Sequence, residues 1–91
     1  MHRITIMSKP GCHLCEVALG TVQKVIGSHV PVLIEEIDIT QDLDLLEKYR
    51  EDIPVVLING AERFRHEVDP QELGRIFVNE LGGSVLGVTF S

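Results

Sequence analysis

The chain changes from a strand pattern to a helix pattern within residues 3–26, which read RITIMSKPGCHLCEVALGTVQKVI. The opening of this stretch is rich in apolar and β-branched side chains, which predicts a strand. Pro10 and Gly11 then interrupt the strand directly before Cys12. From Cys12 to Ile26 the apolar side chains recur at three- and four-residue spacing, which predicts a helix. The two cysteines of the chain therefore stand in the first turn of the predicted helix.

The rest of the chain predicts a second strand, a short helix, a hairpin and a last helix. These elements are expected at residues 32–39 (strand), 42–50 (helix), 55–58 (strand), 61–68 (strand) and 70–81 (helix). Asn59-Gly60 between two strand-like runs is the strongest short signal for a hairpin. Asp69 and Pro70 are typical of a helix start, as N-cap and first helical residue. The element order is therefore βαβ–α–ββα.

This order predicts an α/β domain. A strand–helix–strand unit of this length implies two parallel strands joined by a right-handed crossover. The continuous apolar run at 55–58 is typical of a strand buried on both faces, and the polar run at 61–68 is expected at a sheet edge. Helices must then cover both faces of a mostly buried sheet.

Length, composition and charge limit the possible classes of function. The 91 residues suffice for one domain, and 44% hydrophobic residues predict a packed fold. We expect this domain at residues 1–83. The tail at 84–91 shows no pattern that assigns it, and it could pack on the domain or on a second copy. The net charge is −6 and the eight Lys and Arg residues are scattered, so we expect neither a nucleic-acid partner nor binding to an anionic membrane surface.

The sequence also bears on the compartment. No stretch approaches the roughly 18–20 apolar residues of a membrane span, and the first residues lack the pattern of a signal peptide. We therefore expect a cytoplasmic protein. In that compartment a cysteine pair is usually catalytic, redox-sensing or metal-binding, and seldom a structural link.

Cys12 and Cys15 lie three positions apart, so on a helix their sulfurs share one face and can meet. We expect Cys12 at the N-cap or in the first turn, where unpaired N–H groups and the helix dipole stabilise a thiolate. In such positions the pKa of a thiol falls from ~8.5 to between ~3.5 and ~7.5. Cys15 lies almost one turn further in and should be more buried. Cys12 is therefore expected to attack a substrate disulfide, and Cys15 to resolve the mixed disulfide.

Three neighbours of the cysteines have two interpretations each. His13 either lowers the pKa of the Cys12 thiol as a partly protonated imidazole, or points to solvent. Lys9 either adds positive potential near the thiolate, or is a solvated loop lysine. Glu16 would oppose a nearby thiolate, although most such glutamates face water.

A zinc site is the main alternative interpretation of a Cys-x-x-Cys pair in a cytoplasmic protein. A zinc site usually needs four protein ligands, from two such pairs or from one pair and two suitably spaced histidines. The chain has only two cysteines, and His2, His29 and His66 lack that spacing. We therefore predict no metal, and a site built from the cysteines and two distant histidines stays as an alternative. A pair of ordinary buried cysteines is the third interpretation.

The run KPGCHLCE at 9–16, followed by Ile53-Pro54-Val55, resembles the glutaredoxin-like branch of the thioredoxin superfamily. The resemblance covers residues 3–81, and the two motifs have the family's order and separation. It implies a thioredoxin/glutaredoxin-like fold with a four-stranded mixed sheet and helices on both faces, which agrees with the element order above. It also implies a proline at position 54 that is cis and faces the cysteines. Ile53 would then present its backbone to an extended substrate peptide. The alternative is that Pro54 merely opens a strand.

The chain departs from glutaredoxins at two places. His13-Leu14 stands between the cysteines, where glutaredoxins commonly have Pro-Tyr. Glu67-Val68-Asp69 stands where they carry two glycines and an acidic residue that hold glutathione. Asp69 is expected to cap the last helix, and binding of an amino group is the alternative. The resemblance thus implies dithiol chemistry for this chain more strongly than it implies glutathione binding. Glutathione remains a possible co-substrate.

The sequence therefore predicts a glutaredoxin-like thiol–disulfide oxidoreductase. Cys12 and Cys15 would be catalytic, and Lys9, His13, Ile53 and Pro54 would contact the substrate. The expected partner is a disulfide-containing protein or a small thiol substrate, with no cofactor. Two alternatives are kept: a thioredoxin-like module that only docks a protein, and a zinc or iron–sulfur site at the two cysteines. The pattern does not decide the oligomeric state.

Overall fold

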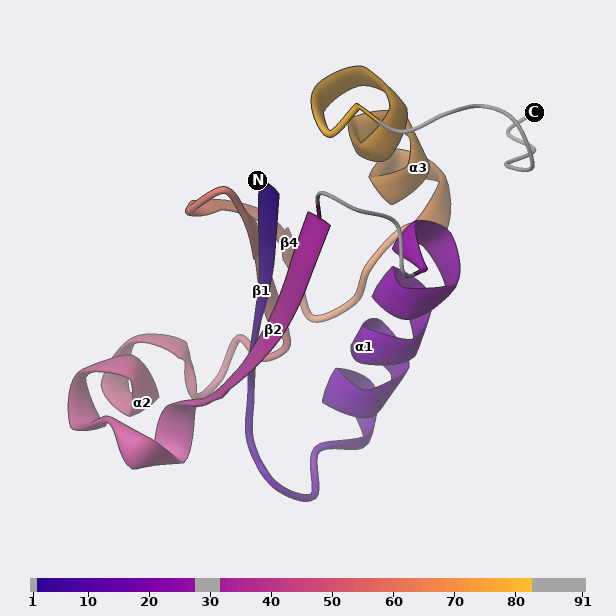
Figure 1. Cartoon of the computed structure of the whole chain (residues 1–91). Helices are drawn as coiled ribbons and strands as arrows, with labels where there is room; N and C mark the ends of the chain where they lie inside the picture. The colour runs from indigo at the N-terminus through magenta and orange to yellow at the C-terminus, as the bar shows by residue number, and fades with distance from the viewer. Residues whose placement is uncertain (1, 28–31, 83–91) are drawn as a thin grey trace.

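A central strand, β1 (His2–Ser8), organises the computed structural model, which describes residues 2–27 and 32–82 (Figure 1). The elements that follow it are α1 (His13–Ile26), β2 (Val32–Asp38), the 3₁₀ turn η1 (Ile39–Gln41), α2 (Leu43–Tyr49), β3 (Val55–Ile58), β4 (Ala61–Arg65) and α3 (Pro70–Glu80). This is the predicted order βαβ–α–ββα with a 3₁₀ turn added before α2. The tail predicted at 84–91 lies outside the described residues.

The sheet is mixed and four-stranded, with the order β2-β1-β3-β4. β1 runs parallel to β2, so α1 is the crossover between them, and β1 is antiparallel to β3. β3 and β4 form the predicted hairpin, with β4 at the edge of the sheet. The fold is therefore α/β with a mixed sheet, as the sequence predicts.

Helices lie on both faces of the sheet. Figure 1 shows α1 and α3 on one side and α2 on the other. Because side chains alternate along a strand, β1 divides its apolar residues between the two layers. Ile4 and Ile6 pack with α1 and α3, whereas Met7 packs with Ile39 and Tyr49 around α2. These two apolar clusters hold the three layers together.

The hairpin turn has the conformation that its sequence demands. Asn59 and Gly60 both have positive φ, 51° and 86°, as two-residue hairpin turns require. The Arg3 N–H donates to Asn59 Oδ1 at 2.9 Å, and the Asn59 N–H donates to the Arg3 carbonyl at 2.8 Å. The turn is thus joined to β1 as well as to its own strands.

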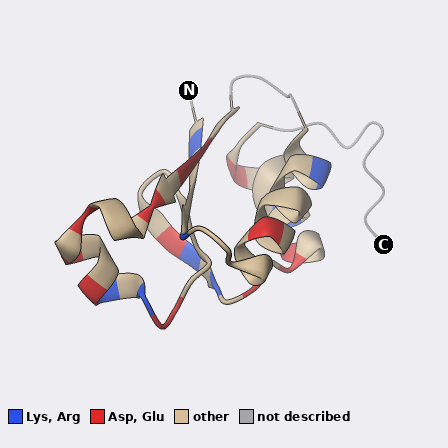
Figure 2. Cartoon of the chain, turned by 90° about the horizontal axis from the view of Figure 1, so that it is seen from below, with Lys and Arg blue, Asp and Glu red and all other residues tan. Residues whose placement is uncertain are grey.

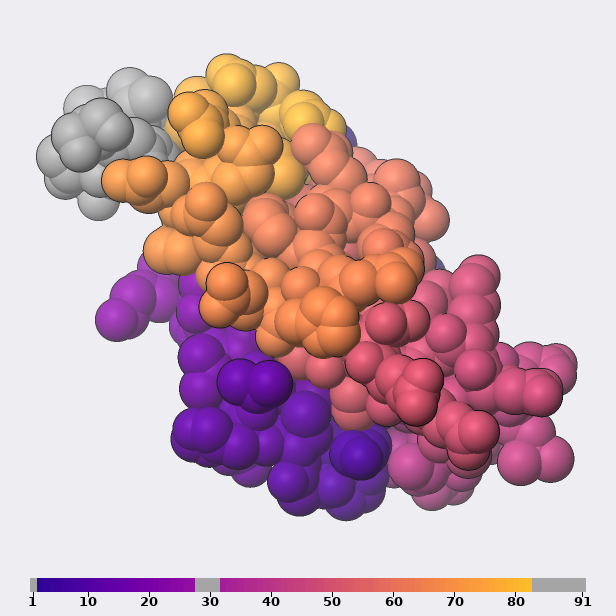
Figure 3. Space-filling view, turned by 180° about the vertical axis from the view of Figure 1, so that it is seen from behind, coloured from indigo at the N-terminus to yellow at the C-terminus, as the bar shows by residue number. Residues whose placement is uncertain are grey.

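The strand predicted at 61–68 is shorter, which corrects that prediction. β4 ends at Arg65, and His66 takes a positive φ of 73° while its N–H donates to the Pro54 carbonyl at 2.8 Å. The chain then leaves the sheet so that Val68, 8% exposed, packs into the α1/α3 core. Figure 3 shows this segment beside α1. Burial of Val68 therefore decides where the strand ends, and its polar neighbours conceal that signal.

Other boundaries move by one residue, and two of them lie at side-chain caps. Cys12 precedes α1 as its N-cap, with extended φ and ψ of −88° and 105°. The strand predicted to reach Ile39 ends at Asp38, whose carboxylate accepts from the Thr40 N–H at 2.8 Å and so caps η1. Side-chain caps set these two boundaries, and for Asp38 this agrees with the preference of Asp for caps.

The core of α3 provides a test of this packing. Leu73 is fully buried between α3 and the sheet. Leu73→Ala removes buried methyl groups and leaves a cavity, so we predict a loss of about 2–5 kcal/mol in the free energy of unfolding. Urea denaturation measures this loss.

Leu43→Ala is the matched control, because Leu43 is 80% exposed. We expect that variant to lose less than about 0.5 kcal/mol. Equal losses in the two variants would contradict the assigned core.

Candidate active site

Cys12 and Cys15 form a disulfide at the beginning of α1, with a Cα–Cα distance of 5.2 Å. The Cys15 N–H donates to Cys12 Sγ at 3.2 Å, so the sulfur occupies the place of an N-cap acceptor. The Cys12 N–H donates to the Lys9 carbonyl at 3.3 Å, which closes the turn made by Pro10 and Gly11. The break between strand and helix thus holds the first sulfur at the helix N-terminus.

The two sulfurs differ in exposure. Cys15 is 1% exposed and belongs to the cluster with Met7 and Tyr49, whereas Cys12 is half-buried at the surface of that cluster. A reagent therefore reaches Cys12 before Cys15. A helix N-terminus also stabilises negative charge on Cys12, because its N–H groups have no partner within the helix.

The loop before β3 lies against the cysteines. The Ile53–Pro54 peptide is cis, and both residues are buried. Ile53 packs in the same cluster as Cys15, with Cys12 against it. The structure thus brings together the two motifs that lie about 40 residues apart in the chain.

A charged pair at the edge of the sheet anchors this loop, and sequence reasoning missed it. Arg65 Nη1 lies 3.3 Å from Asp52 Oδ2, and its guanidinium also binds Glu62 at 2.8 Å. The hydrogen bonds to Glu62, with the nearby Asp52 carboxylate, raise the pKa of Arg65 above its ordinary value. Arg65 lies opposite Val55 in a β3–β4 register that shifts between Val56 and Leu57, so no local sequence signal could have found the pair.

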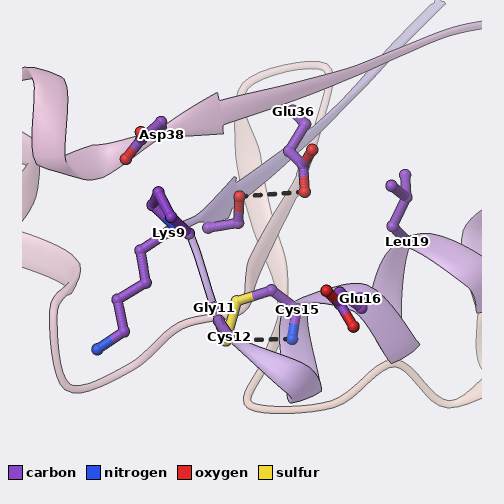
Figure 4. Close-up of a pocket in the computed structure, with 10 residues that line it drawn as sticks. Lys9, Gly11, Cys12, Cys15, Glu16, Leu19, Glu36 and Asp38 are labelled. Atoms are coloured by element: carbon purple, nitrogen blue, oxygen red, sulfur yellow. Dashed lines mark hydrogen bonds between the residues drawn. A yellow bond between two sulfur atoms is a disulfide. The ribbon is translucent and has the colours of Figure 1, made fainter.

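The two basic residues near the cysteines have side chains that lie in solvent or extend away from the disulfide. Figure 4 shows the Lys9 side chain extending away from the disulfide. The His13 side chain is 84% exposed, and its Nδ1 lies 4.0 Å from Glu16 Oε2. The structure therefore favours the solvated interpretation of both residues, and substrate contact by either stays a prediction.

Asp69 acts as the predicted cap of α3. One of its carboxylate oxygens accepts from the Gln71 N–H at 2.9 Å and from the Glu72 N–H at 3.5 Å. The carboxylate is therefore engaged with the helix, and the preceding Val68 is buried in the core.

A cavity of about 340 Å³ lies beside the disulfide, between α1 and β2 (Figure 4). Both cysteines line it, together with the β1–α1 loop. Glu36 and Asp38 reach it from β2, where Figure 2 shows acidic positions along the strand. One side of the cysteine pair thus faces a hollow with carboxylates, and the other faces the Ile53–Pro54 loop.

Comparison with known proteins decides the family. The model of the glutaredoxin-like domain (DUF836) matches residues 3–77. The chain belongs to this glutaredoxin-like family. It is 31% identical over 75 residues to the glutaredoxin-like protein YDR286C homolog of Dictyostelium discoideum, an alignment that covers 77% of this chain and 69% of that protein. The resemblance seen in the two motifs is thereby confirmed.

Solved structures confirm the fold of this glutaredoxin-like chain. A thioredoxin-2, described as a component of the malaria parasite protein secretion machinery, superimposes with a TM-score of 0.63 at 15% identity. That match covers 88% of this chain and 84% of the other. The oxidised thioredoxin of Plasmodium falciparum gives a TM-score of 0.57 at 12% identity and covers 85% and 78%. At such identities the likeness concerns the thioredoxin fold alone.

Residues 2–27 and 32–82 show no feature of a membrane span or of a metal site. No helix there is long and apolar enough to cross a membrane. In the same residues, no three His, Cys, Asp or Glu side chains are grouped as a metal site would require.

The difference in exposure predicts which cysteine reacts. After reduction, a brief pulse of iodoacetamide should label Cys12 at least about tenfold faster than Cys15, because only Cys12 combines access with a helix N-terminus. Peptide mass spectrometry after the pulse measures both rates.

The same pulse after unfolding in urea is the control, since it removes the difference in burial. The two cysteines should then react at similar rates. Faster labelling of Cys15 in the folded protein would contradict the assignment.

Proposed function

We propose that this glutaredoxin-like chain is a thiol–disulfide oxidoreductase that exchanges electrons between its Cys12–Cys15 pair and a substrate disulfide. The observation that supports this most directly is the disulfide itself, which joins a half-buried N-cap cysteine to a buried cysteine one turn further along α1. This arrangement offers one sulfur to a substrate and keeps the second within reach of the first.

The reaction proceeds in two exchanges. The Cys12 thiolate attacks one sulfur of the substrate disulfide, a mixed disulfide forms, and the first substrate sulfur leaves as a thiolate that takes up a proton. The Cys15 thiolate then attacks Cys12 Sγ, the mixed disulfide breaks, and the second substrate sulfur leaves. Two electrons have passed to the substrate, and an external thiol reductant restores the dithiol.

A protein disulfide is the substrate class that the surroundings favour. Leu14 and Val17 follow Cys12 on α1 and are 55% and 51% exposed, so the first turns of α1 present apolar side chains to solvent. Ile53 packs beside the two cysteines, where its backbone could pair with an extended segment of the partner. Both features suit a peptide chain better than a small thiol.

Glutathione is the weaker candidate. The backbone of glutathione can approach most closely at glycines, which have no side chain. This chain has Glu67-Val68 at the position where glutaredoxins carry two glycines. Val68 is buried, and the Asp69 carboxylate already caps α3. We therefore propose glutathione as a reductant of the pair at most, and not as its specific ligand.

Cysteine variants test the proposed reaction. Cys12→Ser should abolish reduction of a protein disulfide such as that of insulin, because no attacking sulfur remains. Cys15→Ser should instead accumulate a mixed disulfide through Cys12, because nothing resolves it. Turbidity of reduced insulin and intact mass measure the two results.

Each Cys→Ser substitution replaces a sulfur by an oxygen with little change in shape. Each variant is therefore the control for any effect of the substitution on the fold in the other. Unchanged turnover by Cys12→Ser would contradict the scheme. Absence of both turnover and mixed disulfide in the wild type would favour the docking module, and a bound metal in elemental analysis would favour a metal site.

A further inference from the structure

Two successive glutamates on β2 make matching contacts on opposite faces of the sheet. Glu35 Oε1 accepts from the Thr5 hydroxyl at 2.9 Å, and Glu36 Oε2 accepts from the Ser8 hydroxyl at 3.1 Å. Because side chains alternate along a strand, only one of the two faces α1. Glu36 lies opposite Ile6 in the β1–β2 register, and Ile6 packs in the α1/α3 core, so Glu36 is that residue.

Glu36 interrupts an apolar face. Val32 and Ile34 precede it on the same side of β2 and pack against the α1/α3 core. A third apolar residue would continue this layer, but a carboxylate stands there and binds Ser8, which is 4% exposed. The break in the pattern coincides with the cavity beside the disulfide, which both Glu36 and Ser8 line.

The chemistry proposed above requires a proton acceptor at this place. Before Cys15 can attack the mixed disulfide, its thiol must lose a proton, because the thiolate is the nucleophile. Cys15 is 1% exposed, so its proton leaves by way of the cavity that this side chain lines. The cavity that Cys15 lines leads to Glu36, and Figure 4 shows Glu36 reaching from β2 toward α1.

We propose that Glu36 is the general base that accepts the proton of Cys15 during resolution, and that Ser8 positions its carboxylate. This inference rests on the proposed oxidoreductase function. The proton passes from Cys15 Sγ to the Glu36 carboxylate across the cavity, which is large enough to hold water. Cys15 Sγ then forms the bond to Cys12 Sγ, the substrate thiolate leaves, and Glu36, which is exposed, returns the proton to solvent.

The other charged groups that line the cavity are less suited to this role. One Asp38 oxygen accepts from both the N–H and the hydroxyl of Thr40, and these bonds lower the pKa of Asp38, which makes it a poorer base. The Glu16 side chain is 75% exposed and lies beside His13. Lys9 carries a cation and extends away from the disulfide.

A reaction with two phases separates resolution by Cys15, in which Glu36 would act, from the first attack by Cys12. The reduced protein is mixed with dithiobis-nitrobenzoate, whose thiolate is coloured. Attack by Cys12 releases a first equivalent, and resolution by Cys15 releases a second. In Glu36→Gln we expect the first phase unchanged within about twofold, and the second phase slowed at least about tenfold near pH 7.

The pH profile of the second phase shows whether Glu36 acts as a general base or only through its negative charge. The second phase of the wild type should be nearly level between about pH 6 and 8, whereas that of Glu36→Gln should rise steeply toward the ~8.5 pKa of a free thiol. A purely electrostatic role predicts the opposite change, because loss of a negative charge makes a nearby thiolate easier to form and so speeds the second phase.

Glu35→Gln is the matched control, since it removes the same charge from the adjacent position on the other face. It should leave both phases unchanged. Ser8→Ala keeps the carboxylate but removes its donor, and we expect the second phase to slow by about threefold. An unaltered or faster second phase in Glu36→Gln, or an equal effect in Glu35→Gln, would overturn the assignment of Glu36. Release of only one equivalent by the wild type would instead overturn the proposed function.

Discussion

The burial of Cys15 between α1 and the Ile53–Pro54 loop is the constraint on which the site depends. This cysteine joins the end of β1, the beginning of α1 and the loop before β3 in one apolar cluster. Cys12 can then occupy the N-cap, because the next turn of the helix is already held against the sheet. The same packing that stabilises the fold therefore sets the distance between the two sulfurs and their difference in exposure.

The two sides of the cysteine pair have different surroundings. Toward the Ile53–Pro54 loop the surroundings are apolar and suited to a substrate segment. Toward β2 they are polar, with a cavity and the Ser8–Glu36 pair. A substrate can thus bind on one side while protons are exchanged on the other. The alternation of side chains along β2 produces this division, since it places Glu35 and Glu36 on opposite faces.

Most of the fold could be predicted from local sequence signals. The Asn59-Gly60 turn, the Asp69-Pro70 helix start and the apolar spacing of α1 each act within a few residues, and the structure confirms all three. The early end of β4 could not be predicted, because it depends on burial of Val68 against distant α1. The cysteine pair was recognised from its spacing. The Arg65–Asp52 pair and the Ser8–Glu36 contact require the strand register, which a single sequence does not supply.

Reversible chemistry at the two cysteines underlies the proposed function, and a redox titration tests it most directly. The protein would be equilibrated in glutathione buffers of graded potential, its thiols trapped, and its mass read. We predict an intramolecular Cys12–Cys15 disulfide that forms and disappears at one defined potential. A glutathione adduct on Cys12 would show that glutathione reacts with the cysteine pair. Cysteines that stay reduced and unmodified across the whole range would contradict the account.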